Sequence, residues 1–358
     1  MNELPHIFLE THNLKNLYSG FGQYNYHLLK NISEIEHEYN FTIHVKKKYL
    51  PEELEAHFNL KEYKSLSRHK LFRVRKKYDL WHSVNQNTKI EPLFDIPYLL
   101  TLHDIIFIEK DERDNIDRKQ LRRLKNKIKR SRAIVYISEY AKDIANQYLE
   151  IPNIPEYVIY NGNPVQQRFD TYKIKPTYKP EKRFLFCIGQ FFEMKNYHTL
   201  IPMMTYLRDY ELILAGYHEK PYGEFVQKQI DKYGLNNRVR LVGKISEDDK
   251  HYYLQYCEAL VFPSLLEGFG LPPIEAMAYG KPVFLAKRTS LPEIGGEKAF
   301  YWEGFDPKYM SLVIQHGLTC YYENQFEYQE YYRKRAQQFD WSTTARQYME
   351  VYKSLLKS

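Results

Sequence analysis

Residues 262–283 read FPSLLEGFGLPPIEAMAYGKPV, and this stretch decides the fold class. The apolar run ALVF at residues 259–262 is typical of a buried strand, and Gly268 and Gly270 mark a loop behind it. Residues 271–273, Leu-Pro-Pro, open a helix, because proline is favoured in a first helical turn. A strand, a glycine-containing loop and a helix in this order predict one unit of a parallel α/β sheet.

The same stretch carries two carboxylates, Glu267 in the loop and Glu275 about one turn inside the helix. Free N–H groups at a helix start attract anions such as phosphate, and a carboxylate can accept the hydroxyls of a sugar or ribose. Acids also occur near helix N-termini for structural reasons alone, because the helix dipole favours them there. The surrounding Gly-x-Gly and Pro-Pro context favours a ligand site over that alternative.

Short apolar runs alternate with helical patterns along the whole chain, which is typical of parallel sheets flanked by helices. We expect strands at residues 6–9, 41–45, 80–83, 97–102, 133–137, 157–159, 184–188, 211–215, 239–242, 259–263 and 282–286. Helices are expected to start near residues 22, 116, 138, 196, 222, 246 and 272.

One aperiodic stretch, residues 166–182, contains two prolines and many polar residues and is predicted to be a linker. It separates an N-terminal domain at 1–165 from a C-terminal domain at 183–339. Both domains are expected to be doubly wound α/β sheets, in which ligands bind outside the carboxyl ends of the strands.

The composition supports this division into two domains. The chain has 358 residues, of which 43% are hydrophobic and 27% charged, as in ordinary globular proteins. Its three cysteines lie far apart, which argues against a disulfide framework or a zinc site and favours a reducing compartment. No secretory signal and no membrane span are evident, so we expect a cytoplasmic protein.

Positive charge is concentrated in the first third of the chain. Residues 110–132 hold eleven Lys or Arg and four acids, and residues 61–77 hold eight and one. An anionic membrane surface, a phosphorylated substrate, nucleic acid or a solvated helix face would each account for this. Leu121, Leu124 and Ile128 recur at helical spacing, which suits a helix on a surface or one packed on its own sheet. Nucleic acid is not expected, because no zinc-finger spacing or RNP-like motif is present.

The segment at 262–283 resembles the E-x7-E signature of family 4 glycosyltransferases, which are retaining enzymes of the GT-B fold. Further segments similar to this family are FLFCIGQFFEMKNYHTL (184–200), LAGY (214–217), RVRLVGKISEDD (238–249), SLPEIGGEKAFYWEGFDP (290–307), TLHDI (101–105), YISEYAK (136–142), VIYNG (158–162) and FDWSTTARQYMEVYKSLL (339–356). Residues 30–95 match little. The resemblance implies two Rossmann-like domains facing a cleft, with a C-terminal helix at 340–358 that returns to the N-terminal domain.

The resemblance implies a nucleotide-sugar site in the C-terminal domain. Glu275 would bind the ribose hydroxyls, Glu267 the hydroxyls of the donor sugar, and Lys195 the diphosphate leaving group. Backbone contacts are expected from two loops: with sugar and diphosphate from Gly268, Phe269, Gly270 and Leu271, and with the base from Gly243, Lys244 and Ile245.

The N-terminal domain would complete this site. His103 would contact the donor sugar, and the alternative for it is a histidine satisfied within the core. Gly20 and Gly22, in SGFGQY, would form a loop that faces the phosphates. The family often has an Arg shortly before Lys195, where this chain has Gln190, and an amide supplies hydrogen bonds but no charge.

The resemblance implies metal-independent transfer of a hexose from a nucleotide sugar to a glycan or lipid-linked acceptor, in bacterial surface polysaccharide or glycoconjugate synthesis. Mannose from GDP-mannose is the first expectation, and a UDP-linked donor remains open. No D-x-D pair is present, so neither a metal site nor a cofactor is expected. The basic stretches leave peripheral contact with an anionic membrane open. The alternatives are a non-catalytic GT-B subunit that binds a partner or glycan, a nucleic-acid binder, and a sugar phosphorylase or epimerase.

Overall fold

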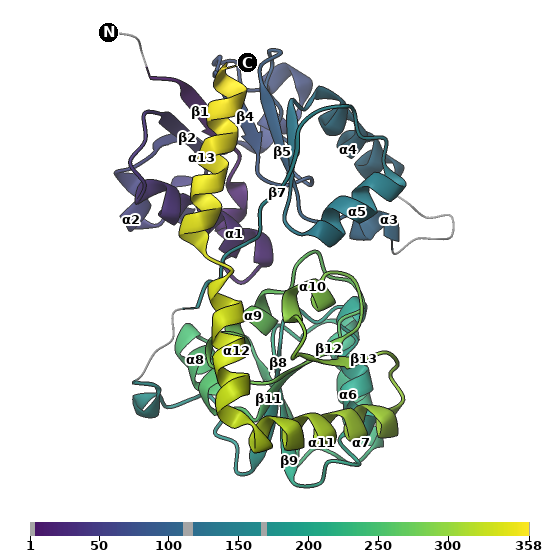
Figure 1. The fold of residues 1–358 in the computed structure, drawn as a ribbon. Helices are drawn as coiled ribbons and strands as arrows, with labels where there is room; N and C mark the ends of the chain where they lie inside the picture. Colours follow the sequence, from purple (N-terminus) through teal and green to yellow (C-terminus); the bar gives the residue numbers. More distant parts are fainter. Residues whose placement is uncertain (1–3, 110–116, 166–169, 358) are drawn as a thin grey trace. The chain divides into compact units, whose positions relative to one another are not determined.

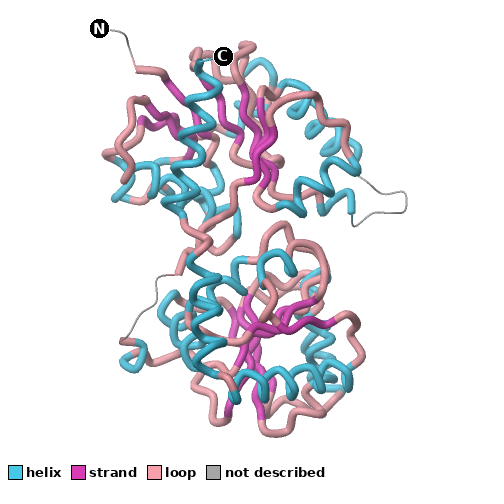
Figure 2. The backbone as a smooth tube through the Cα atoms, viewed as in Figure 1, coloured by secondary structure: helices cyan, strands magenta, loops and turns pink. Residues whose placement is uncertain are grey.

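The protein is described by a computed structural model that covers residues 4–109, 117–165 and 170–357 (Figure 1). It divides into two compact units. Unit 1 comprises Met1–Pro164 and Asp340–Ser358, and unit 2 comprises Val165–Phe339. Each unit contains one parallel sheet with helices on both sides (Figure 2).

The sheet of unit 1 has the strand order β3-β2-β1-β4-β5-β6-β7. Its strands are β1 (His6–Leu9), β2 (Asn40–Val45), β3 (Asn59–Glu62), β4 (Leu80–Ser83), β5 (Tyr98–Leu102), β6 (Ala133–Tyr136) and β7 (Glu156–Val158). All neighbours are parallel, with β1 between β2 and β4 in the register Ile7↔Phe41 and Phe8↔Trp81. The six expected strands are confirmed. The edge strand β3 was not predicted, because its sequence NLKE is exposed and has no apolar alternation.

The helices of unit 1 are α1 (Gly20–Ser33), α2 (Glu52–Glu55), α3 (Ile106–Glu109), α4 (Arg118–Arg130), α5 (Glu139–Tyr148) and α13 (Trp341–Lys357). They bury a hydrophobic core on each face of the sheet. Leu124 and Ile128 of α4 are buried in one of these cores, and Leu121 packs against it. Of the two alternatives for this helix, packing on its own sheet is therefore correct.

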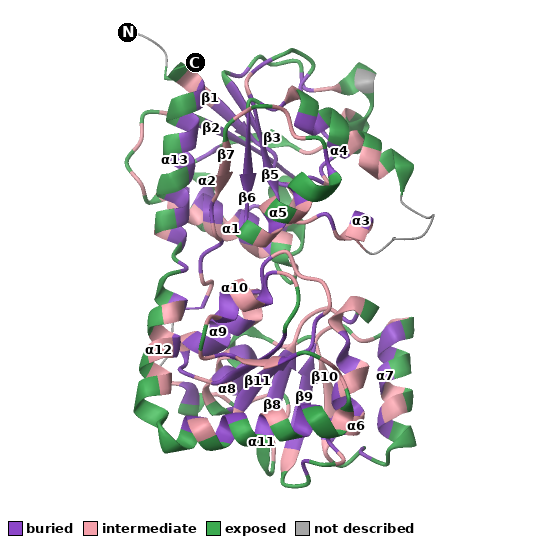
Figure 3. Cartoon of the chain, turned by 45° about the vertical axis from the view of Figure 1, so that its right-hand side comes forward, coloured by how far each residue is buried: buried purple, intermediate pink, exposed green. Residues whose placement is uncertain are grey.

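The last helix, α13, belongs to unit 1 although it follows the whole of unit 2 in sequence. One side of it is buried and the other exposed (Figure 3). Its buried tyrosines hydrogen-bond deep in the unit: Tyr348 contacts Tyr24 at 2.6 Å between hydroxyl oxygens, and Tyr352 contacts His82 at 2.8 Å. The expected return of a C-terminal helix to the N-terminal domain is confirmed.

The sheet of unit 2 has the strand order β10-β9-β8-β11-β12-β13. Its strands are β8 (Arg183–Ile188), β9 (Tyr210–Ala215), β10 (Val239–Gly243), β11 (Ala259–Phe262), β12 (Val283–Ala286) and β13 (Phe300–Trp302). Its helices are α6 (Leu200–Met203), α7 (Pro221–Lys232), α8 (Glu247–Tyr256), α9 (Leu271–Ala278), α10 (Leu291–Gly295), α11 (Pro307–Glu323) and α12 (Gln325–Gln337). The five expected strands are confirmed, and the short strand β13 was missed.

Short 3-10 helices complete both units, at His12–Lys15, Lys47–Tyr49, Ser65–Arg68, Lys70–Phe72, Thr171–Lys173, Glu193–Lys195 and Tyr197–Thr199. No helix among the described residues is both long enough and apolar enough to cross a bilayer.

The predicted linker at 166–182 is held by unit 2 over the part that the structure describes, residues 170–182. Thr177 donates its backbone N–H and its hydroxyl to Asp249, at 2.8 and 2.7 Å. The backbone N–H groups of Glu181 and Lys182 both donate to Glu211, at 2.8 Å. Buried carboxylates thus fix this segment, so it is part of unit 2 rather than a free connection. Residues 166–169 lie outside the described residues.

Candidate functional site

The strand order of unit 2 reverses direction between β8 and β11. From β8 the chain continues outward through β9 and β10, whereas β11 starts the run through β12 and β13. In open parallel sheets ligands bind at such a switch point, outside the carboxyl ends of the two strands. The segment after β8 carries Lys195, and the segment after β11 carries Glu267. Topology therefore places these two predicted residues at the same edge of the sheet.

Lys195 and Glu267 form a direct ion pair between the lysine Nζ and the carboxylate Oε1. Both side chains are largely buried. The two segments also bond to each other through their backbones, because Leu265 N donates to Met194 O at 2.7 Å. The predicted cation and the predicted sugar-binding carboxylate thus lie together, 72 residues apart in sequence. Their individual roles remain predictions.

The helix expected to start near Asn196 is wrong in detail. Lys195 ends a 3-10 helix, Asn196 has a left-handed backbone with φ 58°, and a second 3-10 helix precedes α6 at Leu200. Pro202 explains this, because proline is tolerated in the first turn of an α-helix but not further inside one. The early break leaves Lys195 on a tight turn beside the second loop rather than on a helix surface.

The loop at residues 267–270 is held by the start of α10. The Thr289 hydroxyl accepts from Glu267 N at 3.2 Å, and the Ser290 hydroxyl bonds to the carbonyls of Phe269 and Glu267 at 2.7 and 3.0 Å. Thr289 has φ 51°, a strained conformation for a β-branched residue. Gly270 precedes α9 with φ 113°, a conformation that a glycine adopts without strain. Thr289 was missed, and no periodicity marks it.

Glycines also end the neighbouring strands β9 and β10. Gly216 has φ 144° and Gly243 φ 73°. A Cβ atom on Gly216 would lie 1.9 Å from the carbonyl oxygen of Gly189, which follows β8. Only glycine fits such a contact, so Gly216 lets the segments that follow β8 and β9 pack closely together. Gly243 was predicted here, whereas Gly216 was not.

Two further predicted residues follow Gly243. Lys244 places its ammonium 5.0 Å from the ring centre of Tyr217. Ile245 precedes Ser246, which caps α8 and accepts from Asp249 N at 3.0 Å. Their expected backbone contacts with a base remain predictions, as do those of Gly268, Phe269 and Leu271 with sugar and diphosphate.

Glu275 lies inside α9 and is only 6% exposed. Its Oε1 is 3.4 Å from the ammonium of Lys250 on α8, which also contacts Glu247 at 2.7 Å. Burial raises the pKa of Glu275, and the charge of Lys250 opposes that increase. Lys250 was not predicted as a site residue, because a lysine among the acids of SEDDK resembles an ordinary helix surface.

Gln190 occupies the place where the family often has an arginine. Its carbonyl accepts from Phe192 N at 3.0 Å, so its backbone shapes the turn after β8.

Among the described residues no group of three or more His, Cys, Asp or Glu could hold a metal ion.

The predicted loop around Gly20 and Gly22 is in fact the first turn of α1. Ser19 caps this helix, and its hydroxyl accepts from Gly22 N at 3.1 Å. A Cβ atom on Gly22 would lie 2.0 Å from the carbonyl oxygen of Asn16, whereas one on Gly20 would meet open space. Gly22 therefore has a packing role, and the sequence did not show that Ser19 starts the helix early.

His103 follows β5 in unit 1 and is buried. Its Nε2 donates to Val84 O at 2.9 Å, and its ring packs edge-on against Phe21 and Tyr24. Burial lowers its pKa to about 4, so the ring is neutral at physiological pH. These contacts are those of a histidine satisfied within the core, and its contact with a donor sugar stays a prediction.

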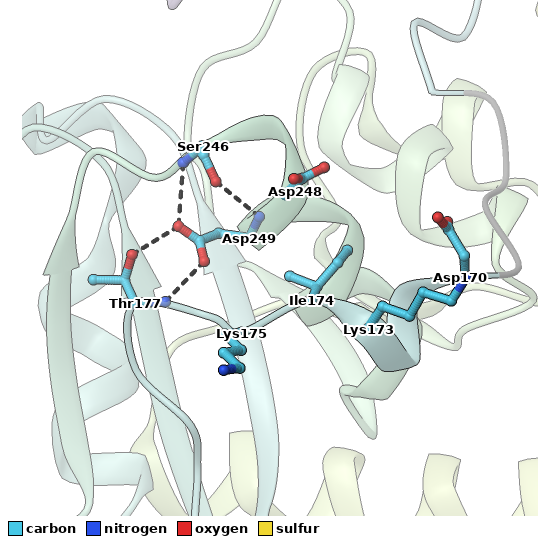
Figure 4. A pocket seen from close by; sticks show the side chains of 8 residues that line it. All are labelled: Asp170, Lys173, Ile174, Lys175, Thr177, Ser246, Asp248 and Asp249. Carbon is cyan, nitrogen blue, oxygen red and sulfur yellow. Dashed lines mark hydrogen bonds between the residues drawn. The ribbon is translucent and has the colours of Figure 1, made fainter.

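One pocket of unit 2 has a volume of about 630 Å³ (Figure 4). It is lined by Asp170, Lys173, Ile174, Lys175, Thr177, Ser246, Asp248 and Asp249. Asp249 points toward Thr177 and Ser246 and binds both, so its role there is structural (Figure 4). None of the predicted site residues lines this pocket.

Two Rossmann-like parallel sheets, with a last helix that returns to the first unit, define the GT-B class of glycosyltransferase folds. Solved structures of that class share the whole chain's architecture. A sucrose-phosphate synthase from Thermosynechococcus elongatus aligns with a TM-score of 0.79 and 19% identity, over 99% of both chains. Anabaena Alr3699/HepE, solved with UDP and glucose, aligns with a TM-score of 0.72 and 19% identity, over 98% of this chain and 100% of its own.

Residues 169–338 match the family described as glycosyl transferases group 1. The matched residues lie within unit 2. Among curated relatives, the serotype-specific mannosyltransferase WbdA of Escherichia coli is 27% identical over 289 residues, 75% of this chain and 35% of its own. The O-antigen chain mannosyltransferase B of E. coli is 33% identical over 161 residues, 44% of this chain and 41% of its own. The chain spans about a third of the length of the WbdA proteins that it matches.

Proposed function

We propose that this protein is a retaining glycosyltransferase that moves a hexose from a nucleotide sugar to a glycan or lipid-linked acceptor. The observation that carries this proposal is the convergence of Lys195 and Glu267 at the switch point of unit 2. The loop that holds Glu267 leads directly into α9, and α9 carries Glu275. One site thus offers a cation, two carboxylates and a glycine-lined backbone.

Each of these groups has a distinct task in the proposed reaction. The ammonium of Lys195 would bind the diphosphate and stabilise the charge that grows on it as the glycosidic bond breaks. The carboxylate of Glu267 would accept sugar hydroxyls and hold the ring in place. Lys195 and Glu267 neutralise each other in their ion pair, and a donor would give each of them a new partner. Glu267 is not assigned as a nucleophile, and the acceptor would attack from the face that the diphosphate leaves.

The choice of nucleotide and sugar in the donor rests on similarity to the relatives and structural neighbours. The named relatives are mannosyltransferases, which favours GDP-mannose, whereas the Anabaena neighbour was solved with UDP and glucose. Because Lys195 supplies the positive charge that a metal would otherwise provide, we propose that the reaction needs no metal ion or other cofactor.

A donor screen tests the proposal. The wild-type protein is incubated with GDP-mannose, UDP-glucose, UDP-galactose and ADP-glucose in EDTA, and nucleoside diphosphate release and thermal unfolding are recorded. A nucleotide at 100 times its Kd should stabilise the fold by about 2.7 kcal/mol. We expect stabilisation and release with one donor, with GDP-mannose first. Stabilisation without release, even with saccharide acceptors, would favour the non-catalytic subunit, and no effect from any nucleotide would contradict the proposal.

We also propose that unit 1 contacts an anionic membrane where a lipid-linked acceptor would lie. The supporting feature is a surface of exposed Leu71, Phe72, Leu93 and Phe94, which we call the apolar–basic surface. Leu93 N donates to Val74 O at 3.2 Å, so the two segments lie side by side. Exposed Arg68, Arg75, Lys76 and Lys77 accompany them.

The basic helix α4 contributes less to this surface than its sequence suggests. Lys127 is buried and hydrogen-bonds to Ser83 at 2.8 Å, and Arg130 pairs with Glu91 at 2.8 Å. Arg122 remains exposed. Since the apolar side of α4 packs on its own sheet, membrane contact would rest on the apolar–basic surface instead.

A further inference from the structure

Lys250 is buried in a position that is unfavourable for a lysine. It lies directly after the first three residues of α8, near the helix end where the dipole disfavours a cation, and it is only 7% exposed. Burying a charge is costly unless it is paired. An apolar side chain would normally serve a buried helix position better, so the charge of Lys250 calls for an explanation.

Two carboxylates surround this ammonium. Glu247, on the same helix, lies 2.7 Å away with an exposed side chain. Glu275, on the neighbouring helix α9, lies 3.4 Å away and is buried. Among the described residues, two charged groups influence the ionisation of Glu275. The positive charge of Lys250 lowers its pKa, and the negative charge of Glu247 raises it. Glu247 would disfavour the ionised form of Glu275, so Lys250 alone supports it.

The state of Glu275 matters for its proposed task. A carboxylate that accepts two ribose hydroxyls must be ionised, because a protonated carboxyl has less acceptor capacity. Burial raises the pKa of Glu275, and buried glutamates without a partner can reach values of about 8–9. Without a nearby cation, a large fraction of Glu275 would therefore be protonated at neutral pH.

We propose that Lys250 is a positioning residue of the nucleotide site, which keeps the Glu275 carboxylate ionised and oriented to accept the ribose hydroxyls. The inference rests on the proposed function, because it requires Glu275 to bind the nucleotide. Lys250 contacts Glu275 and would act on the nucleotide through that carboxylate. This role explains why a charged lysine occupies a buried position, whereas a role in packing alone would be served by an apolar side chain.

The test is the affinity for GDP and UDP between pH 6 and pH 9, measured by titration calorimetry. Lys250→Met removes the charge and keeps a similar shape. At pH 6.5 we expect roughly ten-fold weaker binding, the loss of one charge-assisted hydrogen bond. The deficit should shrink as the pH rises, because Glu275 then ionises without help. Lys250→Arg should keep the wild-type pH profile.

Two controls separate positioning from fold stability. Lys298→Met removes another Lys–Glu pair of unit 2, that with Glu327, and should leave affinity unchanged. In a Glu275→Gln background, Lys250→Met should have no further effect on affinity, because the two residues would act through one carboxylate. Wild-type affinity and pH profile in folded Lys250→Met would overturn the inference. Failure of the wild-type protein to bind any nucleotide would instead overturn the proposed function.

Discussion

A substitution of Glu275 tests the proposed nucleotide site, because this residue is expected to bind the ribose. Glu275→Gln keeps the shape of the side chain and removes its charge. A hydrogen bond to a charged group contributes about 1.5–3 kcal/mol, so the affinity for the preferred nucleoside diphosphate should fall by roughly 10- to 150-fold. Titration calorimetry measures this, with Glu303→Gln, an exposed acid of the same unit, as the control. Equal affinity of both variants would remove Glu275 from the site.

The residues that sequence reasoning found and those it missed differ in one physical respect. Glu267 and Glu275 are separated by seven residues within one loop–helix segment, so the E-x7-E pattern in the sequence reveals both. Lys250 and Thr289 reach the same region through contacts between helices or loops distant in sequence. Such contacts exist only after the sheet has formed, and composition or periodicity contains no trace of them.

At the scale of the elements, α13 is fixed to unit 1 by buried hydroxyl groups. The Tyr348 hydroxyl contacts Tyr24 at 2.6 Å and Thr101 at 3.0 Å. Tyr348→Phe would leave the buried hydroxyls of Tyr24 and Thr101 without this hydrogen-bond partner. The loss should lower the free energy of unfolding by about 1–3 kcal/mol. Urea unfolding measures this, with the exposed Tyr172→Phe as a control. A shift no larger than that of the control would show that the network does not stabilise α13.

Element boundaries were predictable wherever burial was strong. The expected strands lie within one residue of their predicted ends, because central parallel strands are apolar runs bounded by polar turns. The edge strand β3 is polar and exposed, so nothing in its composition separates it from a loop. The turn at Lys195 was not predicted, because the helical pattern around it continues up to Pro202, which delays the α-helix to Leu200.

At the scale of the whole molecule, unit 1 should be sensitive to acid. Burial lowers the pKa of His44 to about 4, of His82 to about 3 and of His103 to about 4. In the unfolded chain these groups titrate near 6.5, so the unfolded state binds more protons as the pH falls below that value. Stability present above pH 6.5 is therefore lost toward pH 4, by up to about 1.4 kcal/mol per pH unit for each histidine.

Urea midpoints of the unit 1 transition at pH 7.5 and 5.5 check this expectation. His82→Gln removes one titrating ring and should reduce the pH dependence by roughly a third. A transition that is independent of pH between these values would show that the buried histidines are protonated in the folded protein as well.

Membrane contact also belongs to the whole molecule. Liposomes with anionic lipid should carry the protein upward in a flotation gradient at low salt, because each Lys or Arg near such a surface contributes about 1 kcal/mol. The double change Leu71→Ser and Phe72→Ser should reduce flotation, whereas Leu312→Ser, at an exposed leucine of unit 2, should not. Absence of the wild-type protein from the floating fraction would indicate that unit 1 does not dock on lipid.

The switch-point site of unit 2 is proposed to transfer a sugar, and the rate of nucleoside diphosphate release by Lys195→Ala is the measurement that checks this. The assay uses the donor that the wild-type protein accepts, in EDTA, with Lys287→Ala as an exposed lysine control. Loss of a group that stabilises transition-state charge should lower kcat by roughly 10²–10³ with a smaller change in KM. Wild-type kcat in Lys195→Ala, or an effect confined to KM, would contradict the proposed role of this site in sugar transfer.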